Sequence, residues 1–144
     1  MNIGTMMYLA PECIDDGLVS NEKNSSSLAK KIDVYAFSII MWEILFETIP
    51  FIESPVSNSI RRDIPTIKIP YLVTKGERPT ILQNSDEISQ WVQQHGLETY
   101  RNIHSFIENY QRLLTNCWLQ SPLKRPTFTE ILNSIEDLRK LLQE

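Results

Sequence analysis

Residues that bind metals or form disulfide bridges are scarce in this chain of 144 residues. It has two cysteines, Cys13 and Cys117, and two histidines, His95 and His104. The cysteines lack the close spacing of a zinc site and are too few for a disulfide framework, so we expect reduced thiols and no metal. Each histidine falls in a helical pattern, and we expect it to be a surface or packed side chain rather than a catalyst.

The chain also lacks a strong excess of charge of one sign and a long apolar run without charged residues. The formal net charge is −4, which argues against binding to nucleic acid or to an anionic membrane. The most apolar stretch, residues 32–51, contains Asp33, Glu43 and Glu47, and these acids make a membrane span costly. The first residues lack the basic region and apolar run of a signal peptide. We therefore expect a cytoplasmic location and no contact with membrane or nucleic acid.

The motifs of several enzyme classes are missing as well. Spacing alone reveals no Gly-rich phosphate loop, no ordered Ser, His and Asp set and no paired-carboxylate cleft. What is present is an ordinary globular composition, with 42% hydrophobic and 22% charged residues. A chain of this length can bury about 70% of the surface that its unfolded form exposes. Composition thus predicts one domain with a real core and gives no function.

The apolar pattern predicts a mainly helical fold. Residues 33–47 are apolar nearly all round, which indicates a helix buried on most sides, with Asp33 as a plausible N-cap. The spacing of three and four returns in residues 86–96 and again in residues 100–118, and predicts two further helices. A capping box at residues 127–130 opens a final helix. Its apolar stripe comprises Phe128, Ile131, Leu132, Ile135, Leu138 and Leu142.

The segments between these helices carry turn signals. Residues 1–14 are predicted to be extended or turning, with a short helical piece after Pro11, and the polar residues 15–31 are predicted to form a surface loop. Prolines exclude a long helix from most of residues 50–82. Within that region, residues 66–73 alternate briefly as a strand would, although a proline interrupts them.

Four separated segments resemble the protein kinase family, in that family's order. They are "GTMMYLAPE" (4–12), "KIDVYAFSIIMWEIL" (31–45), "KGERPTI" (75–81) and "CWLQSPLKRPTFTEIL" (117–132). They are similar, in turn, to the end of the activation segment with its A-P-E signature, the central buried helix of the C-lobe, the G-x-R-P turn, and the segment that opens the last helix. The resemblance implies a partial kinase domain over residues 1–144, with a central buried helix, the helices that follow it, and no N-lobe.

The form of these motifs points to a group within the family. The G-T-x-x-Y-x-A-P-E pattern is similar to that of Ser/Thr-specific kinases. The D-V-Y-x-F and C-W…R-P-T-F patterns are shared by tyrosine kinases and the tyrosine-kinase-like group. Together they imply a tyrosine-kinase-like kinase whose complete form would move the γ-phosphoryl group of ATP to Ser or Thr of a protein. Specificity for tyrosine is the less favoured variant.

The resemblance also assigns roles to individual residues. Gly4, Thr5 and Tyr8 would shape the docking shelf for the substrate, and Thr5 would contact the catalytic Asp and Lys. Glu12 would pair with Arg125, and Asp33 would accept hydrogen bonds from backbone N–H groups of the catalytic loop. The remaining motif residues are structural, with the two tryptophans as core anchors: Ala10, Pro11, Trp42, Arg78, Pro79, Trp118 and Pro126.

Several kinase features do not occur in the chain. It contains no His-Arg-Asp, no Asp-Phe-Gly and no Gly-rich loop, so we expect no catalytic residue, no metal ligand and no bound ATP or magnesium here; these would belong to a complete parent kinase. Ser38 and Ile32 depart from the usual motif, and residues 82–103 are interpreted as an insertion.

Three interpretations of function follow. The chain is a fragment of a working kinase, a kinase-like binding or scaffold module that contacts a protein partner, or a partial product with no stable function. Met1, directly before the motif, and the joint retention of Thr5, Glu12, Asp33 and Arg125 favour the fragment. Because a fragment would leave its central helix partly uncovered, we expect the isolated chain to be partly disordered or to aggregate.

Overall fold

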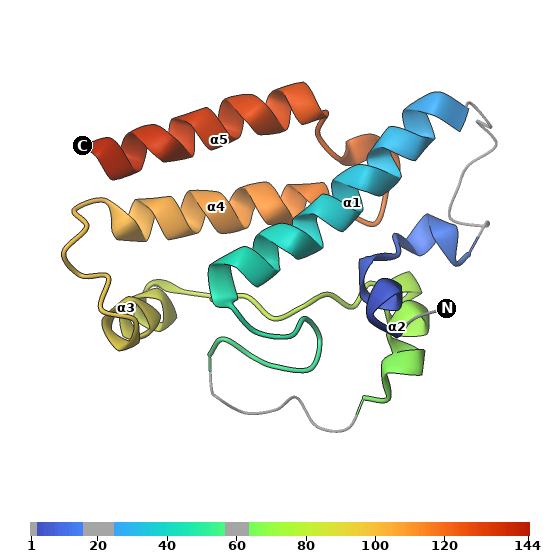
Figure 1. Ribbon diagram of the computed structural model, residues 1–144, viewed down its shortest axis with the longest axis horizontal. Coiled ribbons are helices and arrows are strands. Elements are labelled where there is room, and N and C mark those ends of the chain that lie inside the picture. Colours follow the sequence, from blue (N-terminus) through green and yellow to red (C-terminus); the bar gives the residue numbers. More distant parts are fainter. Residues whose placement is uncertain (1–2, 16–24, 57–63) are drawn as a thin grey trace.

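All regular structure in the described part of the chain is helical. The computed structural model describes residues 3–15, 25–56 and 64–144, and no strand occurs within these ranges (Figure 1). The elements in chain order are the 3-10 helices and α-helices η1 (Ile3–Tyr8), η2 (Pro11–Cys13), α1 (Ser25–Phe46), η4 (Thr66–Lys68), α2 (Ile69–Thr74), α3 (Ser85–Gln94), α4 (Ile103–Cys117), η5 (Pro122–Lys124) and α5 (Phe128–Gln143). The prediction of a mainly helical fold is confirmed. Within the same ranges, no helix is long and apolar enough to cross a membrane.

Helix α1 lies at the centre of the arrangement. It crosses α4, while α4 and α5 run antiparallel to each other and α3 lies beside α4 (Figure 1). At the other side, η1 and η2 lie against α2. The buried side chains of α1 include Val34, Tyr35, Ile39 and Trp42, which are at most 1% exposed. The core therefore forms between α1 and the helices that follow it in the sequence.

The start of α1 differs from the prediction. The helix begins at Ser25, so residues 25–31 are helical rather than part of a loop, and Asp33 lies in the third turn instead of at the N-cap. Ala29 and the two lysines after it have high helix propensity, which extends the helix beyond its apolar part. The rest of that predicted loop, residues 16–24, lies outside the described residues.

Residues 66–73 are also helical, so the strand-like alternation was misleading. They form η4 and most of α2, in which Ile69 and Val73 are buried one helical turn apart. Pro70 lies within the first two positions of α2. There its missing N–H removes no hydrogen bond, because the first N–H groups of a helix have no partner within it. The proline therefore starts a short helix instead of ending a strand.

The three helices predicted after residue 85 are confirmed. Helix α3 begins after Asn84, whose side chain accepts a hydrogen bond from the N–H of Glu87, and it ends before Gly96, which has φ of 65°. Left-handed backbone of this kind favours glycine and terminates the helix. Helix α4 spans the second predicted segment. His95 is exposed and its ring stacks on Trp91, with ring centroids 4.2 Å apart, which agrees with the expectation of a surface or packed side chain.

The capping box of α5 is complete. The hydroxyl of Thr127 accepts from the N–H of Glu130 at 3.2 Å, and a Glu130 carboxylate oxygen accepts from the N–H of Thr127 at 2.8 Å. This backbone hydrogen bond from Thr127 is the main cause that lowers the pKa of Glu130. The apolar stripe of α5 is only partly buried, because α4 covers one side of it. Ile131 and Leu138 are buried, whereas Phe128, Leu132, Ile135 and Leu142 are exposed.

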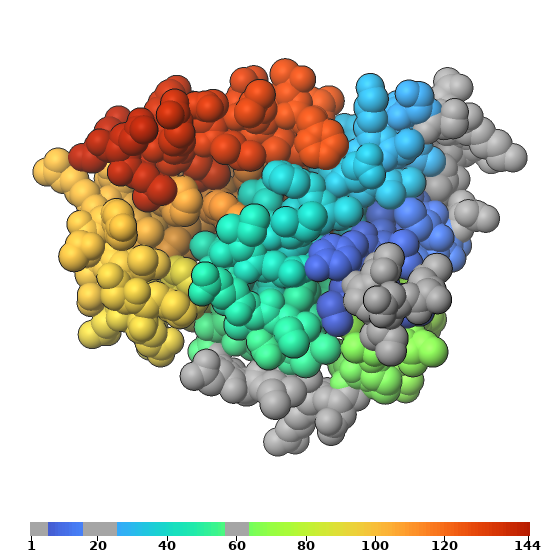
Figure 2. Space-filling view, viewed as in Figure 1, coloured from blue at the N-terminus to red at the C-terminus, as the bar shows by residue number. Residues whose placement is uncertain are grey.

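One strip of α1 is exposed too. Ile40 is 44% exposed and Ile44 is 66% exposed, although the helix was predicted to be buried on most sides. Phe37, on the same strip, contacts Phe128 of α5 edge to face, with ring centroids 5.9 Å apart. Figure 2 shows α1 and α5 next to each other on one face of the molecule. We call Phe37, Ile40 and Ile44 the open strip of α1.

The capping box gives a first prediction. Replacing Thr127 with alanine removes the hydroxyl acceptor at the start of α5 and should lower the free energy of unfolding by about 1 kcal/mol. Urea denaturation followed by circular dichroism measures this loss. Thr129→Ala is the control, because Thr129 is also exposed but lies past the N-cap. Equal losses for both variants would contradict the assigned role of the cap.

The open strip gives a second prediction. Exposed apolar surface favours association, so the chain should self-associate with rising concentration in analytical ultracentrifugation. Ile44→Lys should reduce that association by placing a charge on the strip. Ile49→Lys makes the same change at a residue that is 47% exposed outside α1, and it should have little effect. A wild-type chain that stays monomeric at high concentration would refute the idea.

Candidate functional site

The segment predicted to dock substrate lies on the helical body beside α2. Residues 3–8 form η1, which contacts α1, η4 and α2. The Tyr8 hydroxyl donates a hydrogen bond to the carboxylate of Glu43 on α1. This bond, followed by burial and the Glu43 charge, raises the pKa of Tyr8 to about 12. Tyr8 is therefore a neutral donor fixed to the central helix. The contacts expected of Gly4 and Thr5 with substrate and with catalytic residues stay predictions.

The A-P-E signature is anchored by a buried ion pair. Ala10, Pro11 and Glu12 are all buried. The Arg125 guanidinium donates from Nη1 to Glu12 Oε1 at 2.6 Å and from Nη2 to Glu12 Oε2 at 2.9 Å. The two side chains are 0% and 1% exposed. This is the bidentate geometry in which a planar guanidinium binds a carboxylate most strongly. The predicted pairing of Glu12 with Arg125 is confirmed.

Arg125 also joins two further segments to the pair. Its Nε donates to the carbonyl of Leu119 at 2.8 Å, and its Nη1 donates to the carbonyl of Lys31 at 2.9 Å. The Lys31 ammonium in turn donates to the carbonyl of Arg125. One buried guanidinium thus holds together the A-P-E segment, the first half of α1 and the chain that follows α4.

A second guanidinium lies close to the first. Arg78 of the G-E-R-P turn donates at 2.7–3.1 Å to the carbonyls of Val73, Glu77 and Trp118 and to the side-chain oxygen of Gln120. Its central carbon lies 5.1 Å from the ring centroid of Tyr35, and that of Arg125 lies 5.3 Å from the same ring. Tyr35 is fully buried. The two arginines of the kinase-like motifs therefore meet at one aromatic ring on α1.

The other predicted motif residues support this centre. Trp42 is fully buried and donates from its indole N–H to the carbonyl of Thr80 at 2.7 Å, which fixes the chain after Pro79 to α1. Trp118 is 7% exposed and belongs to the core, as predicted of an anchor. Pro126 follows Arg125 and is partly buried. These contacts give the four sequence motifs one common location in the fold.

Comparison with known proteins agrees with this arrangement. The protein kinase domain family matches residues 1–135. The chain belongs to the protein kinase family. It is 28% identical over 99% of its length to a probable LIM domain-containing serine/threonine-protein kinase of Dictyostelium discoideum. It is 31% identical over 98% of its length to a light-sensor protein kinase of Ceratodon purpureus, and 29% identical over 92% to the dual specificity protein kinase shkC of Dictyostelium discoideum.

The chain corresponds to a small part of these relatives. It covers 16% of the LIM domain-containing kinase, 9% of the light-sensor kinase and 19% of the dual specificity kinase. The matched part is the helical region of a kinase C-lobe, in accordance with the fold described above.

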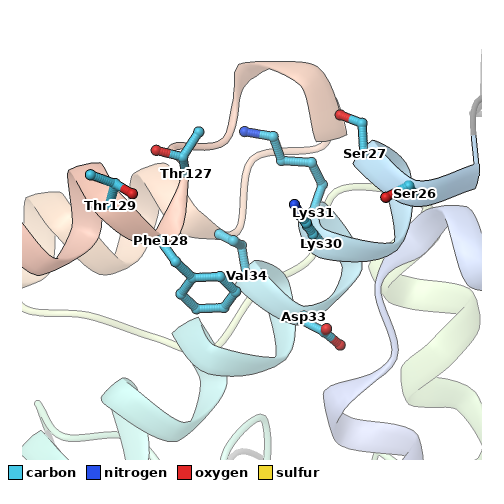
Figure 3. Close-up of a pocket in the computed structure, with 9 residues that line it drawn as sticks. All are labelled: Ser26, Ser27, Lys30, Lys31, Asp33, Val34, Thr127, Phe128 and Thr129. Carbon is cyan, nitrogen blue, oxygen red and sulfur yellow. The ribbon is translucent and has the colours of Figure 1, made fainter.

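Asp33 stands apart from the rest of the kinase motif residues. It is exposed, and no partner for its carboxylate occurs within the described residues. It lines a groove of about 920 Å³ between the start of α1 and the start of α5, together with lysines and hydroxyl side chains. Figure 3 shows the Asp33 carboxylate turned away from Phe128 and Thr129. Its contact with a catalytic loop stays a prediction.

Four residues of the site were not singled out from the sequence. Lys31, Tyr35 and Gln120 lie within the quoted kinase motifs but had no assigned role, and Glu43 was seen only as an acid in an apolar stretch. An acid in the middle of an otherwise apolar helix is itself a signal, because a buried carboxylate needs a partner. The sequence could not name Tyr8 as that partner, since the two residues are brought together only by the docking of η1 on α1.

The ion pair gives a third prediction. Glu12→Gln leaves the Arg125 charge buried without its counter-charge and should lower the free energy of unfolding by about 3–5 kcal/mol. Glu136→Gln is the control, because Glu136 forms an exposed pair with Arg139 and should lose less than about 1 kcal/mol. Urea denaturation compares the two variants. A Glu12 variant as stable as the Glu136 variant would contradict the structural role of the pair.

Proposed function

We propose that this chain is the substrate-docking part of the C-lobe of a Ser/Thr protein kinase. The observation that carries the proposal is the bidentate bond between Glu12 and Arg125. It fixes the A-P-E segment to the helical body, and η1, which precedes that segment, contacts α2. A fixed segment at that place can receive a protein substrate. The proposed partner is therefore a protein, with residues 4–8 as its contact.

Phosphoryl transfer itself would depend on residues outside these 144. Kinase catalysis requires a base, metal-binding side chains and a phosphate-binding loop, and their sequence signatures do not occur here. We propose that this chain positions substrate and that ATP and magnesium bind to other parts of a complete kinase. The chain alone would then be inactive as a phosphotransferase.

The finer assignments belong to the same proposal. The D-V-Y-A-F and C-W…R-P-T-F sequences support membership of the tyrosine-kinase-like group, and the names of the relatives support Ser/Thr specificity, with one dual specificity kinase among them. The free thiols of Cys13 and Cys117 support a reducing, cytoplasmic location. Residues 82–103, which contain α3 and lie at the edge of α4, are proposed to be an insertion in the family's fold.

A scaffold module is the alternative, and one observation favours it. The open strip of α1 continues onto exposed apolar residues of α5 and offers a surface to a protein partner. The coding sequence upstream of Met1 separates the two functions. In-frame codons for H-R-D-x-x-x-x-N and D-F-G would support the kinase fragment. A stop codon directly upstream would overturn it in favour of the scaffold.

Nucleotide binding gives a fourth prediction. Isothermal calorimetry of the 144-residue chain with ATP and Mg²⁺ should show no binding, because the residues that hold nucleotide in this family are absent from it. A complete protein kinase measured in the same buffer is the positive control. Micromolar binding by the chain, or transfer of labelled phosphate to a protein, would refute the proposed division between docking and catalysis.

A further inference from the structure

Tyr35 occupies an unusual position between two cationic groups. Its ring is fully buried on α1, and the guanidinium carbons of Arg78 and Arg125 lie 5.1 Å and 5.3 Å from its centroid. A guanidinium within about 6 Å of a ring face is attracted by the ring's quadrupole, and the attraction grows when the pair is shielded from water. The Tyr35 ring and Arg125 are buried and Arg78 is partly buried, so both contacts should be stronger than they would be at a fully exposed site.

The two arginines beside the Tyr35 ring differ in their hydrogen-bond acceptors. Glu12 gives both of its carboxylate oxygens to Arg125, whereas the four side-chain hydrogen bonds of Arg78 go to three backbone carbonyls and one amide. Burial lowers the pKa of Arg78, and the neighbouring charge of Arg125 lowers it further while Glu12 raises it. One buried and one partly buried cation thus lie near Glu12, and each lies over the Tyr35 ring.

The Tyr35 hydroxyl does not explain this arrangement. It is buried and forms no hydrogen bond within the described residues. Burial raises the pKa of Tyr35 to about 12, so the ring is neutral near pH 7 and does not act as an anion toward the arginines. The face of the ring is the feature that both guanidinium groups contact.

We propose that Tyr35 is a positioning residue that couples the G-E-R-P turn to the A-P-E segment. Glu12 fixes Arg125, Arg125 fixes the ring, and the ring fixes Arg78. Arg78 in turn holds the end of α2 through the Val73 carbonyl. Residues 10–12 and α2 both lie next to the proposed docking segment, residues 4–8. A change in the position of one would then be accompanied by a change in the position of the other. The coupling itself can be measured in the chain without substrate. Only its consequence for the docking segment rests on the proposed function.

A mutant cycle measures the coupling. Glu12 and Arg78 share no hydrogen bond. Even so, part of the stability lost on Glu12→Gln should come from weaker packing of Arg78 against the Tyr35 ring. Glu12→Gln should therefore raise the equilibrium constant for unfolding by a factor that is about fivefold smaller in an Arg78→Met chain than in the wild type, a usual size for neighbours in one network. The difference should persist with Tyr35→Phe and fall below about twofold with Tyr35→Leu. The proposal would be overturned if the fivefold difference between the Arg78 and Arg78→Met chains persists with Tyr35→Leu. It would also be overturned if that difference is absent when Tyr35 is present.

A spectroscopic readout covers variants that are too unstable for the cycle. In NMR spectra of the folded chain, the ring current should shift the Nε–H signals of Arg78 and Arg125, with Arg112 as an exposed reference. Glu12→Asp should move the Arg78 signal, Tyr35→Phe should leave it in place, and Tyr35→Leu should remove the shift. An Arg78 signal that ignores Glu12→Asp would refute the coupling. The docking function is tested separately by the upstream coding sequence, so either idea can fail while the other stands.

Discussion

The buried charge of Arg125 is the constraint on which the rest of this structure depends. A guanidinium that is 0% exposed must have its donors bonded, because an unpaired charge in a protein interior costs several kcal/mol. Its acceptors come from Glu12, Lys31 and Leu119, which are distant from one another in the sequence. The A-P-E segment, the central helix and the chain after α4 must therefore meet at one point. The position of η1, which precedes the A-P-E segment and contacts α2, follows from that meeting.

Helix α1 serves as the common support of the polar contacts. Three side chains recur at helical spacing on one side of α1. Lys31 donates to the Arg125 carbonyl, the Tyr35 ring contacts both guanidinium groups, and Trp42 donates to the Thr80 carbonyl. Glu43 receives the Tyr8 hydroxyl. Gln111 of α4 adds a reciprocal pair of hydrogen bonds with the backbone of Leu82. An apolar core alone would not choose among similar packings, whereas these directional bonds fix the loops that surround it.

The two sides of α1 differ in a way that suits part of a kinase C-lobe. The side that carries Tyr35 and Trp42 is sealed by segments of this chain, while Ile40 and Ile44 on the opposite strip remain in contact with solvent. Glu12, the acidic residue of the A-P-E motif, is paired with Arg125 within the chain. Asp33, by contrast, has no partner among the described residues. The contacts that anchor the A-P-E segment are thus made within the chain, whereas Asp33 is exposed to solvent.

Periodicity and local capping, which depend on neighbouring residues, determined the helical class from the sequence alone. The capping box at Thr127 and the end of α3 near Gly96 are local in the same sense. The order of the motifs indicated the family, and the resemblance to that family implied the pairing of Glu12 with Arg125, which are 113 positions apart. The early start of α1 and the helical form of residues 66–73 were missed, since propensity is weak and Pro70 signals a break as readily as a helix start. Only the tertiary structure decided that Tyr8 meets Glu43 and that Arg78 and Arg125 share Tyr35. Those contacts join residues far apart in the chain, and they exist because several helices must bury their apolar sides against one another before the polar groups can come within reach.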